Sequence, residues 1–164
     1  MSKAFTSEET ASDPILVRPR PPLPEGVPNY VTPRGLQQLR DEVVRLEQDR
    51  AHAEASEDDA RSARLAAINT RLAELNARIG SAVVLDSSAA ASDEVRFGAT
   101  VSVRNADGSE RRYQIVGVDE AEARAGRVAF VSPLARALLG RRVGDTVLVD
   151  TPRGEEELEI IAVG

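Results

Sequence analysis

Two stretches in the first half of the chain repeat large apolar residues at alternating steps of three and four positions. The aliphatic residues that follow this spacing are Leu36, Leu39, Val43 and Leu46, and then Leu65, Ile68, Leu72, Leu75 and Ile79. Such spacing places the side chains on one narrow face of a helix, as in the seam of a coiled coil. Because the two stretches lie close in sequence, we predict an antiparallel helical hairpin over residues 30–80.

The ends of these helices carry recognisable signals. Thr32 followed by Pro33 predicts a helix start, because threonine caps helices and proline at the first helical position sacrifices no hydrogen bond. Gly80, directly after the last aliphatic residue, predicts a left-handed C-cap. Residues 51–60 contain no large apolar side chain, so we place the bend there.

The predicted bend carries three consecutive acids, Glu57, Asp58 and Asp59, directly after Ser56. One interpretation is structural, since serine caps a helix and acids in the first turn complement its dipole. The other is functional, since carboxylate oxygens are the ligands that Mg²⁺ prefers. Both interpretations stay open on the residues alone.

The second half of the chain changes to a period of two. Alternating apolar residues predict strands at 100–104, 112–116, 128–131, 146–149 and 157–161, with hairpin turns at 105–108 and 151–154. Residues 132–140 begin with a cap and a proline and end with glycine, which predicts a short helix. The fold class is therefore α+β: an antiparallel helical hairpin followed by an antiparallel sheet with one short helix.

The chain divides into four predicted segments. Residues 1–29 hold six of the nine prolines and few large apolar groups, which predicts a disordered tail. The hairpin follows at 30–80, then a short strand at 82–85 within a linker that covers 81–94. The sheet domain fills residues 95–164.

Composition excludes several functions. The net charge is −6 and the arginines are spread along the chain, which argues against a domain that neutralises nucleic-acid phosphates. Without cysteine, thiolate metal sites are excluded, and with His52 as the single histidine, a histidine-based zinc site or catalytic triad would have to be built around that one residue, which argues against most hydrolase chemistry. We interpret His52 as a solvated helix residue. No apolar run is long enough to span a membrane and no secretory leader is present, so we expect a cytoplasmic protein.

Several segments together resemble the Gre family of bacterial transcription elongation factors, GreA and GreB. They are YVTPRGL at 30–36, FGATV at 97–101, YQIVGVDEA at 113–121, SPLARALLG at 132–140, VGD at 143–145 and TPRG at 151–154. The resemblance implies a coiled-coil hairpin that enters the secondary channel of RNA polymerase. It also implies a C-terminal domain similar to FKBP prolyl isomerases that docks at the channel rim.

The resemblance also assigns roles to residues. Acids at the hairpin tip, here Glu57, Asp58 and Asp59, would help hold a Mg²⁺ ion at the polymerase active site, so that the polymerase cleaves backtracked RNA. The factor would not be an enzyme and would bind no cofactor alone. We expect a monomer without sequence-specific DNA binding, whose contacts with polymerase involve Asp119, Glu120, Ser132, Pro133 and Leu134.

Alternatives remain at this stage. The tip lacks the family's aromatic residue, and the hairpin is shorter by roughly two heptads, which reduces its reach by on the order of 10 Å. The chain would then be a channel-occupying regulator without cleavage activity, as the short-hairpin relative Rnk is thought to be. A prolyl isomerase is disfavoured, because Phe97, Tyr113 and Phe130 are expected in strands as core residues. A homodimer through the coiled coil is the third alternative. For Ser132 and Pro133, helix capping alone is the alternative to a contact with polymerase.

Overall fold

The computed structural model describes residues 20–87 and 92–164. Contacts divide them into two compact units. The hairpin unit comprises residues 20–21 and Leu39–Gly80, and the sheet unit comprises Pro22–Gln38 and Ser81–Gly164. The start of the first helix thus groups with the sheet unit, which the four-segment division of the sequence did not anticipate.

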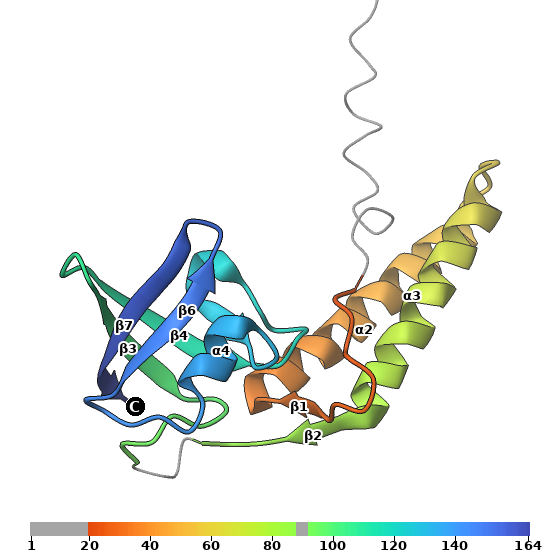
Figure 1. Ribbon diagram of the computed structural model, residues 1–164. Helices are drawn as coiled ribbons and strands as arrows, with labels where there is room; N and C mark the ends of the chain where they lie inside the picture. The colour runs from red at the N-terminus through yellow and green to blue at the C-terminus, as the bar shows by residue number, and fades with distance from the viewer. Residues whose placement is uncertain (1–19, 88–91) are drawn as a thin grey trace, which may run out of the picture. The chain divides into compact units, whose positions relative to one another are not determined.

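Two antiparallel helices form the predicted hairpin (Figure 1). They are α2, Pro33–Ala55, and α3, Arg61–Ser81. Apolar residues of both helices form one buried seam: Leu39, Leu46, Ala53, Ile68, Leu72 and Leu75. The hairpin prediction is confirmed. No helix in the described part of the chain is long and apolar enough to cross a membrane.

Local signals predicted the start of α2 correctly but not the end of α3. Thr32 caps α2, since its Oγ1 accepts the N–H of Gly35 at 2.9 Å, and the predicted start is confirmed. Gly80 is not in the left-handed conformation, and α3 continues through it to Ser81. The predicted C-cap is therefore wrong. The chain passes from α3 directly into a strand that begins at Ala82, so it needs no left-handed reversal there.

Residues 20–29 were assigned to a disordered tail but are ordered, whereas residues 1–19 lie outside the described part of the chain. Within the hairpin unit, Arg20 Nη2 lies 2.6 Å from Glu42 Oε1, and the Arg20 side chain is only 9% exposed. Arg78 donates a hydrogen bond to the Pro21 carbonyl. These contacts tie the segment that precedes α2 to the helices.

A short parallel ladder lies in the sheet unit. Strand β1, Asn29–Val31, pairs with β2, Ala82–Val84, so that Asn29 lies opposite Ala82. The Asn29 side-chain amide donates to Ser81 Oγ at 3.1 Å, and the Leu85 N–H donates to the Val31 carbonyl at 2.9 Å. The short strand predicted at 82–85 is present, whereas its partner β1 was not predicted.

The main sheet has five strands in the order β5-β4-β3-β7-β6. Their bounds are β3, Thr100–Asn105; β4, Glu110–Val116; β5, Arg127–Ala129; β6, Thr146–Thr151; and β7, Gly154–Val163. The hairpin turns between β3 and β4 and between β6 and β7 are confirmed. The sheet is mixed, however, because β5 pairs with β4 in parallel. Residues 117–126 carry the chain back before β5 begins, so β5 runs in the direction of β4.

Helix α4, Pro133–Leu138, packs with β5 and β6, beside the sheet in Figure 1. Alternate positions of the strands supply the core together with this helix: Val101, Val103, Ile115, Ala135, Leu138, Val147, Val149, Leu158 and Ile160. The predicted α+β class is confirmed. Of the aromatic residues expected in strands, only Tyr113 lies in one, since Phe97 and Phe130 occupy turns beside the core.

Candidate functional site

The three tip acids lie in the connection between α2 and α3, as predicted. This connection, Ser56 to Ala60, is called the acidic turn below. Glu57, Asp58 and Asp59 are all exposed. The turn is closed by the Ser56 N–H, which donates to the Ala53 carbonyl at 3.2 Å, and by the Arg61 N–H, which donates to the Asp58 carbonyl at 3.3 Å. The acids therefore occupy the bend itself and precede the first turn of α3.

Asp58 is held by its neighbours. Arg64 Nη2 lies 2.7 Å from Asp58 Oδ1 and 2.6 Å from Oδ2, and Ser56 Oγ donates to Oδ2 at 2.9 Å. The Arg64 guanidinium, followed by the Ser56 hydroxyl, lowers the pKa of Asp58 below its ordinary value because both stabilise the carboxylate. Asp58 is therefore an ionised group with both oxygens engaged inside the hairpin unit.

Glu57 and Asp59 differ from Asp58. In the described part of the chain, neither side chain forms a hydrogen bond or an ion pair. Within the same residues, no group of three or more His, Cys, Asp or Glu side chains is placed to hold a metal ion. Mg²⁺ takes six oxygen ligands and usually keeps several waters. The two free carboxylates of Glu57 and Asp59 are too few to form a complete Mg²⁺ site within the described part of the chain.

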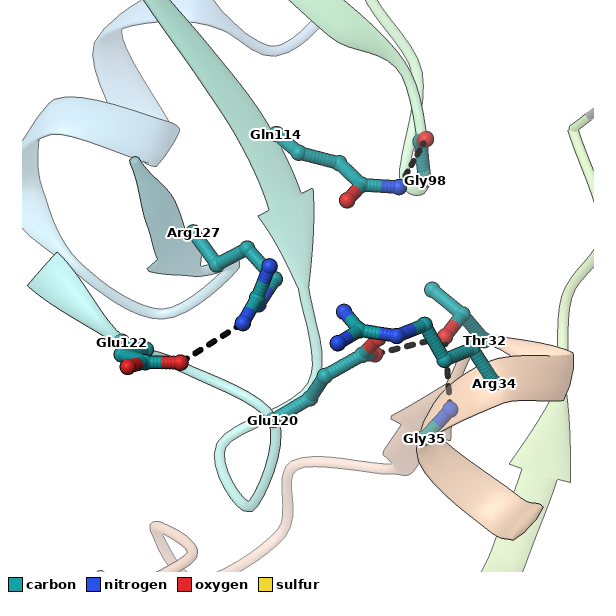
Figure 2. A network of polar contacts seen from close by, with 8 residues as sticks. All are labelled: Thr32, Arg34, Gly35, Gly98, Gln114, Glu120, Glu122 and Arg127. Atoms are coloured by element: carbon teal, nitrogen blue, oxygen red, sulfur yellow. Dashed lines mark hydrogen bonds and ion pairs between the residues drawn. The ribbon is translucent and has the colours of Figure 1, made fainter. Parts of the chain in front are cut away.

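Glu120, predicted to contact a partner, lies inside the sheet unit instead. Its side chain is only 2% exposed and accepts a hydrogen bond from Thr32 Oγ1 at 2.5 Å (Figure 2). Arg34 Nη1 lies 3.5 Å from its other oxygen. Because Thr32 Oγ1 also accepts the Gly35 N–H, the carboxylate completes the cap of α2. The geometry gives Glu120 an internal role and leaves the half-buried Asp119 as the acid of this loop nearer to solvent.

Two glycines make this arrangement possible. A Cβ atom at Gly35 would lie 2.7 Å from Glu120 Oε2 and 3.4 Å from Thr32 Oγ1. A Cβ atom at Gly117 would collide with the Tyr30 carbonyl oxygen of β1. The loop that carries Asp119 and Glu120 therefore packs closely against the segment that leads into α2. Sequence reasoning placed Gly35 and Gly117 within matching segments without assigning either of them this role.

Of the three residues at the start of α4 that were predicted to contact a partner, Ser132, Pro133 and Leu134, only Pro133 is exposed. Ser132 is the N-cap, and its Oγ accepts the Ala135 N–H at 3.2 Å. Pro133 at the first helical position is exposed, and Leu134 is partly buried against the core. Capping thus accounts for Ser132 and packing for Leu134, while Pro133 occupies the first helical position and is exposed.

An aromatic cluster was missed by the sequence analysis. Tyr30 lies with its ring centroid 5.4 Å from that of Phe130 and 6.0 Å from that of Phe97, and the two phenylalanine centroids are 5.6 Å apart. The pairs Tyr30–Phe130 and Phe97–Phe130 are edge-on, an arrangement that stabilises aromatic pairs, and Tyr30–Phe97 is tilted. The rings hold β1 against the turns that carry Phe97 and Phe130. Their mutual packing gives them a structural role.

Comparison with known proteins adds the identity of the family. Residues 90–164 match the family model described as transcription elongation factor, GreA/GreB, C-term. The chain is 37% identical over 151 residues to transcription elongation factor GreB of Neisseria meningitidis serogroup A, covering 82% of this chain and 93% of that protein. It is 40% identical over 149 residues to GreA of Anaeromyxobacter sp. (strain K), covering 81% and 90%.

Among solved structures, GreA factor homolog 1 (Gfh1) of Thermus thermophilus is 25% identical, covering 82% of this chain and 97% of that chain with a TM-score of 0.41. The family assignment rests on the sequence matches, which extend through both the helical hairpin and the sheet unit. With identities of 37% and 40% over four-fifths of its length, the chain belongs to the GreA/GreB family of transcription elongation factors.

Proposed function

We propose that this elongation factor binds bacterial RNA polymerase, inserts the α2–α3 hairpin into the secondary channel, and stimulates cleavage of backtracked RNA. Family membership supports polymerase as the partner. The observation that carries the cleavage role is the pair Glu57 and Asp59, two exposed carboxylates without partners in the described part of the chain. They lie at the bend of a hairpin whose helices have 23 and 21 residues, about 35 Å and about 32 Å long.

The proposed chemistry belongs to the polymerase and is completed by the factor. A divalent cation held jointly with polymerase residues would polarise the reacting phosphate and water. Glu57 and Asp59 would supply oxygens and negative charge to that site, which suits a hard cation. The factor itself would need no cofactor and would not act as an enzyme alone. It would act as a monomer, because a dimer through the hairpin seam would occupy the surfaces that must enter the channel.

A second candidate is a channel-occupying regulator that does not stimulate cleavage. The ion pair between Asp58 and Arg64 favours it, since one of the three carboxylates is already engaged inside the hairpin unit. A hairpin too short for the channel would favour it as well, because a carboxylate that stops several ångströms from the metal ion cannot bind it. Both candidates bind at the channel. They differ only in whether a carboxylate of the acidic turn reaches the metal ion of the polymerase.

Channel entry can be tested by crosslinking, because the chain contains no cysteine. A single Ala60→Cys variant, labelled with a short photocrosslinker, places the probe in the acidic turn. Arg153→Cys, in the turn between β6 and β7, provides the control. We expect the Ala60 probe to react with polymerase residues that line the secondary channel near the active site. Reaction only with the outer surface of polymerase would overturn the proposal.

A further inference from the structure

Arg64 occupies an electrostatically unfavourable position unless it has a partner. It lies in the first turn of α3, which begins at Arg61 and contains no acidic residue in that turn. The N-terminus of a helix carries partial positive charge and favours anions over cations. An arginine there costs helix stability unless a nearby carboxylate compensates for it. Asp58, six residues earlier in the acidic turn, supplies that carboxylate.

Arg64 contacts two side chains of the acidic turn. Its Nη2 atom lies within 2.7 Å of both oxygens of Asp58 and 3.4 Å from Ser56 Oγ. Ser56 in turn donates to Asp58 and accepts the Asp58 N–H at 3.4 Å. The guanidinium therefore joins the start of α3 to both Ser56 and Asp58. The side chains of Ser56, Asp58 and Arg64 thus connect the acidic turn to the first turn of α3.

Glu57 and Asp59, which flank Asp58 in sequence, take no part in these contacts. Adjacent residues in a tight turn point in different directions, so a turn that directs Asp58 toward Arg64 leaves its neighbours free for solvent. Arg61 provides an internal contrast. It lies in the same first turn of α3 and is exposed, and its side chain forms no ion pair within residues 20–87 and 92–164.

We propose that Arg64 is a positioning residue: by holding Asp58 and Ser56, it fixes the acidic turn so that Glu57 and Asp59 are presented to the divalent cation of the polymerase. This inference rests on the proposed function, since it concerns the same acids. It assigns Asp58 to the support of the turn. It also divides three adjacent acids, which sequence reasoning treated alike, into one structural carboxylate and two presented ones.

The first test needs no polymerase. Amide hydrogen exchange of residues 56–60 is measured in the full chain for the wild type, Arg64→Ala, Asp58→Asn, the double variant and Arg61→Ala. Because an exposed ion pair is worth a modest free energy, we expect exchange up to about fivefold faster in both single variants. The double variant should be no faster than either single variant, and Arg61→Ala should match the wild type. Equal exchange in Arg64→Ala and Arg61→Ala would overturn the inference.

The second test measures cleavage in a backtracked polymerase complex. Loss of a residue that orients metal ligands costs about tenfold or more in activity, so we expect about that loss in Arg64→Ala and in Asp58→Asn. The double variant should lose no more than the singles. Arg64→Lys should recover most of the rate, because a single nitrogen makes both contacts with Asp58. Polymerase affinity should be unchanged throughout.

The outcomes separate the two proposals. If the wild type stimulates cleavage and Arg64→Ala does so equally well, the inference on Arg64 is wrong while the proposed function stands. If the wild type binds polymerase without cleavage, the cleavage function is wrong, and the exchange experiment alone decides whether Arg64 fixes the turn. Additive losses in the double variant would show that Arg64 and Asp58 act independently, which contradicts positioning.

Discussion

The hydroxyl of Thr32 joins the first turn of α2 to the carboxylate of Glu120, with 2.5 Å between Thr32 Oγ1 and Glu120 Oε2. The same hydroxyl oxygen accepts the Gly35 N–H, so one side chain both caps the helix and satisfies a buried acid 88 residues away. A carboxylate near a helix N-terminus is further stabilised by the helix dipole. Glu120 therefore contributes to the architecture of the sheet unit.

Replacement of Thr32 by alanine should lower the free energy of unfolding by about 2 to 3 kcal/mol. The loss of a helix cap costs about 1 kcal/mol, and the buried Glu120 oxygen that loses the hydroxyl donor adds a similar or larger amount. Thr32→Ser is the control, because it keeps the hydroxyl and should cost less than half as much. Urea unfolding monitored by circular dichroism measures both. Equal losses in the two variants would show that the hydroxyl contributes nothing.

Alanine at Gly35 should destabilise the protein, although alanine is ordinarily the better helix former by about 1 kcal/mol. The new Cβ would displace the Glu120 carboxylate and disturb its bond to Thr32. Gly80 is the matched control, since it lies in α3 and a Cβ atom added there would meet nothing within 4 Å. We expect thermal unfolding to show a lower Tm for Gly35→Ala and a slightly higher one for Gly80→Ala. A higher Tm for both would contradict the packing argument.

The acidic turn should loosen in acid. Because the pKa of Asp58 is depressed in the folded protein, its stabilising pair with Arg64 is present at neutral pH. The contribution is lost as the pH falls through the folded-state pKa of Asp58. In Arg64→Ala, the titration midpoint of the Asp58 carboxyl carbon in NMR should move up toward its ordinary value, about 3.9. An identical midpoint in wild type and variant would exclude the pair as the cause.

Substitutions at the start of α4 should separate capping from partner contact. Ser132→Ala removes the cap and should cost about 1 kcal/mol of unfolding free energy. Pro133→Ala should change stability by less than about 0.5 kcal/mol, because Pro133 is exposed. If Pro133 contacts polymerase, its replacement should weaken binding by about fivefold, as for an interface residue worth about 1 kcal/mol. Unchanged affinity in a binding titration would restrict this segment to helix capping.

Much of the fold was predictable because its signals are local. The cap at Thr32, the seam through Leu72 and Leu75, and the turn at Asp107 and Gly108 each depend on residues only a few positions apart. The bend was predictable for the same reason, since a segment without large apolar residues cannot continue the seam. These features follow from helix and strand periodicity together with capping chemistry.

The remaining features depend on contacts that no local pattern records. Glu120 is buried because Thr32 and Gly35 meet its loop, and this contact exists only in the folded sheet unit. The direction of β5 depends on the path of residues 117–126 rather than on the residues of the strand. At the tip, the three acids are indistinguishable in sequence, and only the folded turn pairs Asp58 with Arg64.

The most direct test of the account is RNA cleavage by a backtracked bacterial polymerase complex with the wild-type factor and with Glu57 and Asp59 both changed to alanine. A variant with Glu155 and Glu157 changed to alanine removes the same charge from the exposed surface of β7 and serves as the control. Polymerase binding is confirmed for all three. We predict cleavage with the wild type and the control, and a loss of about a hundredfold in the tip variant, since charge stabilisation through a metal ion is worth several kcal/mol. Absence of cleavage by the bound wild type, or equal cleavage by all three proteins, would contradict the account.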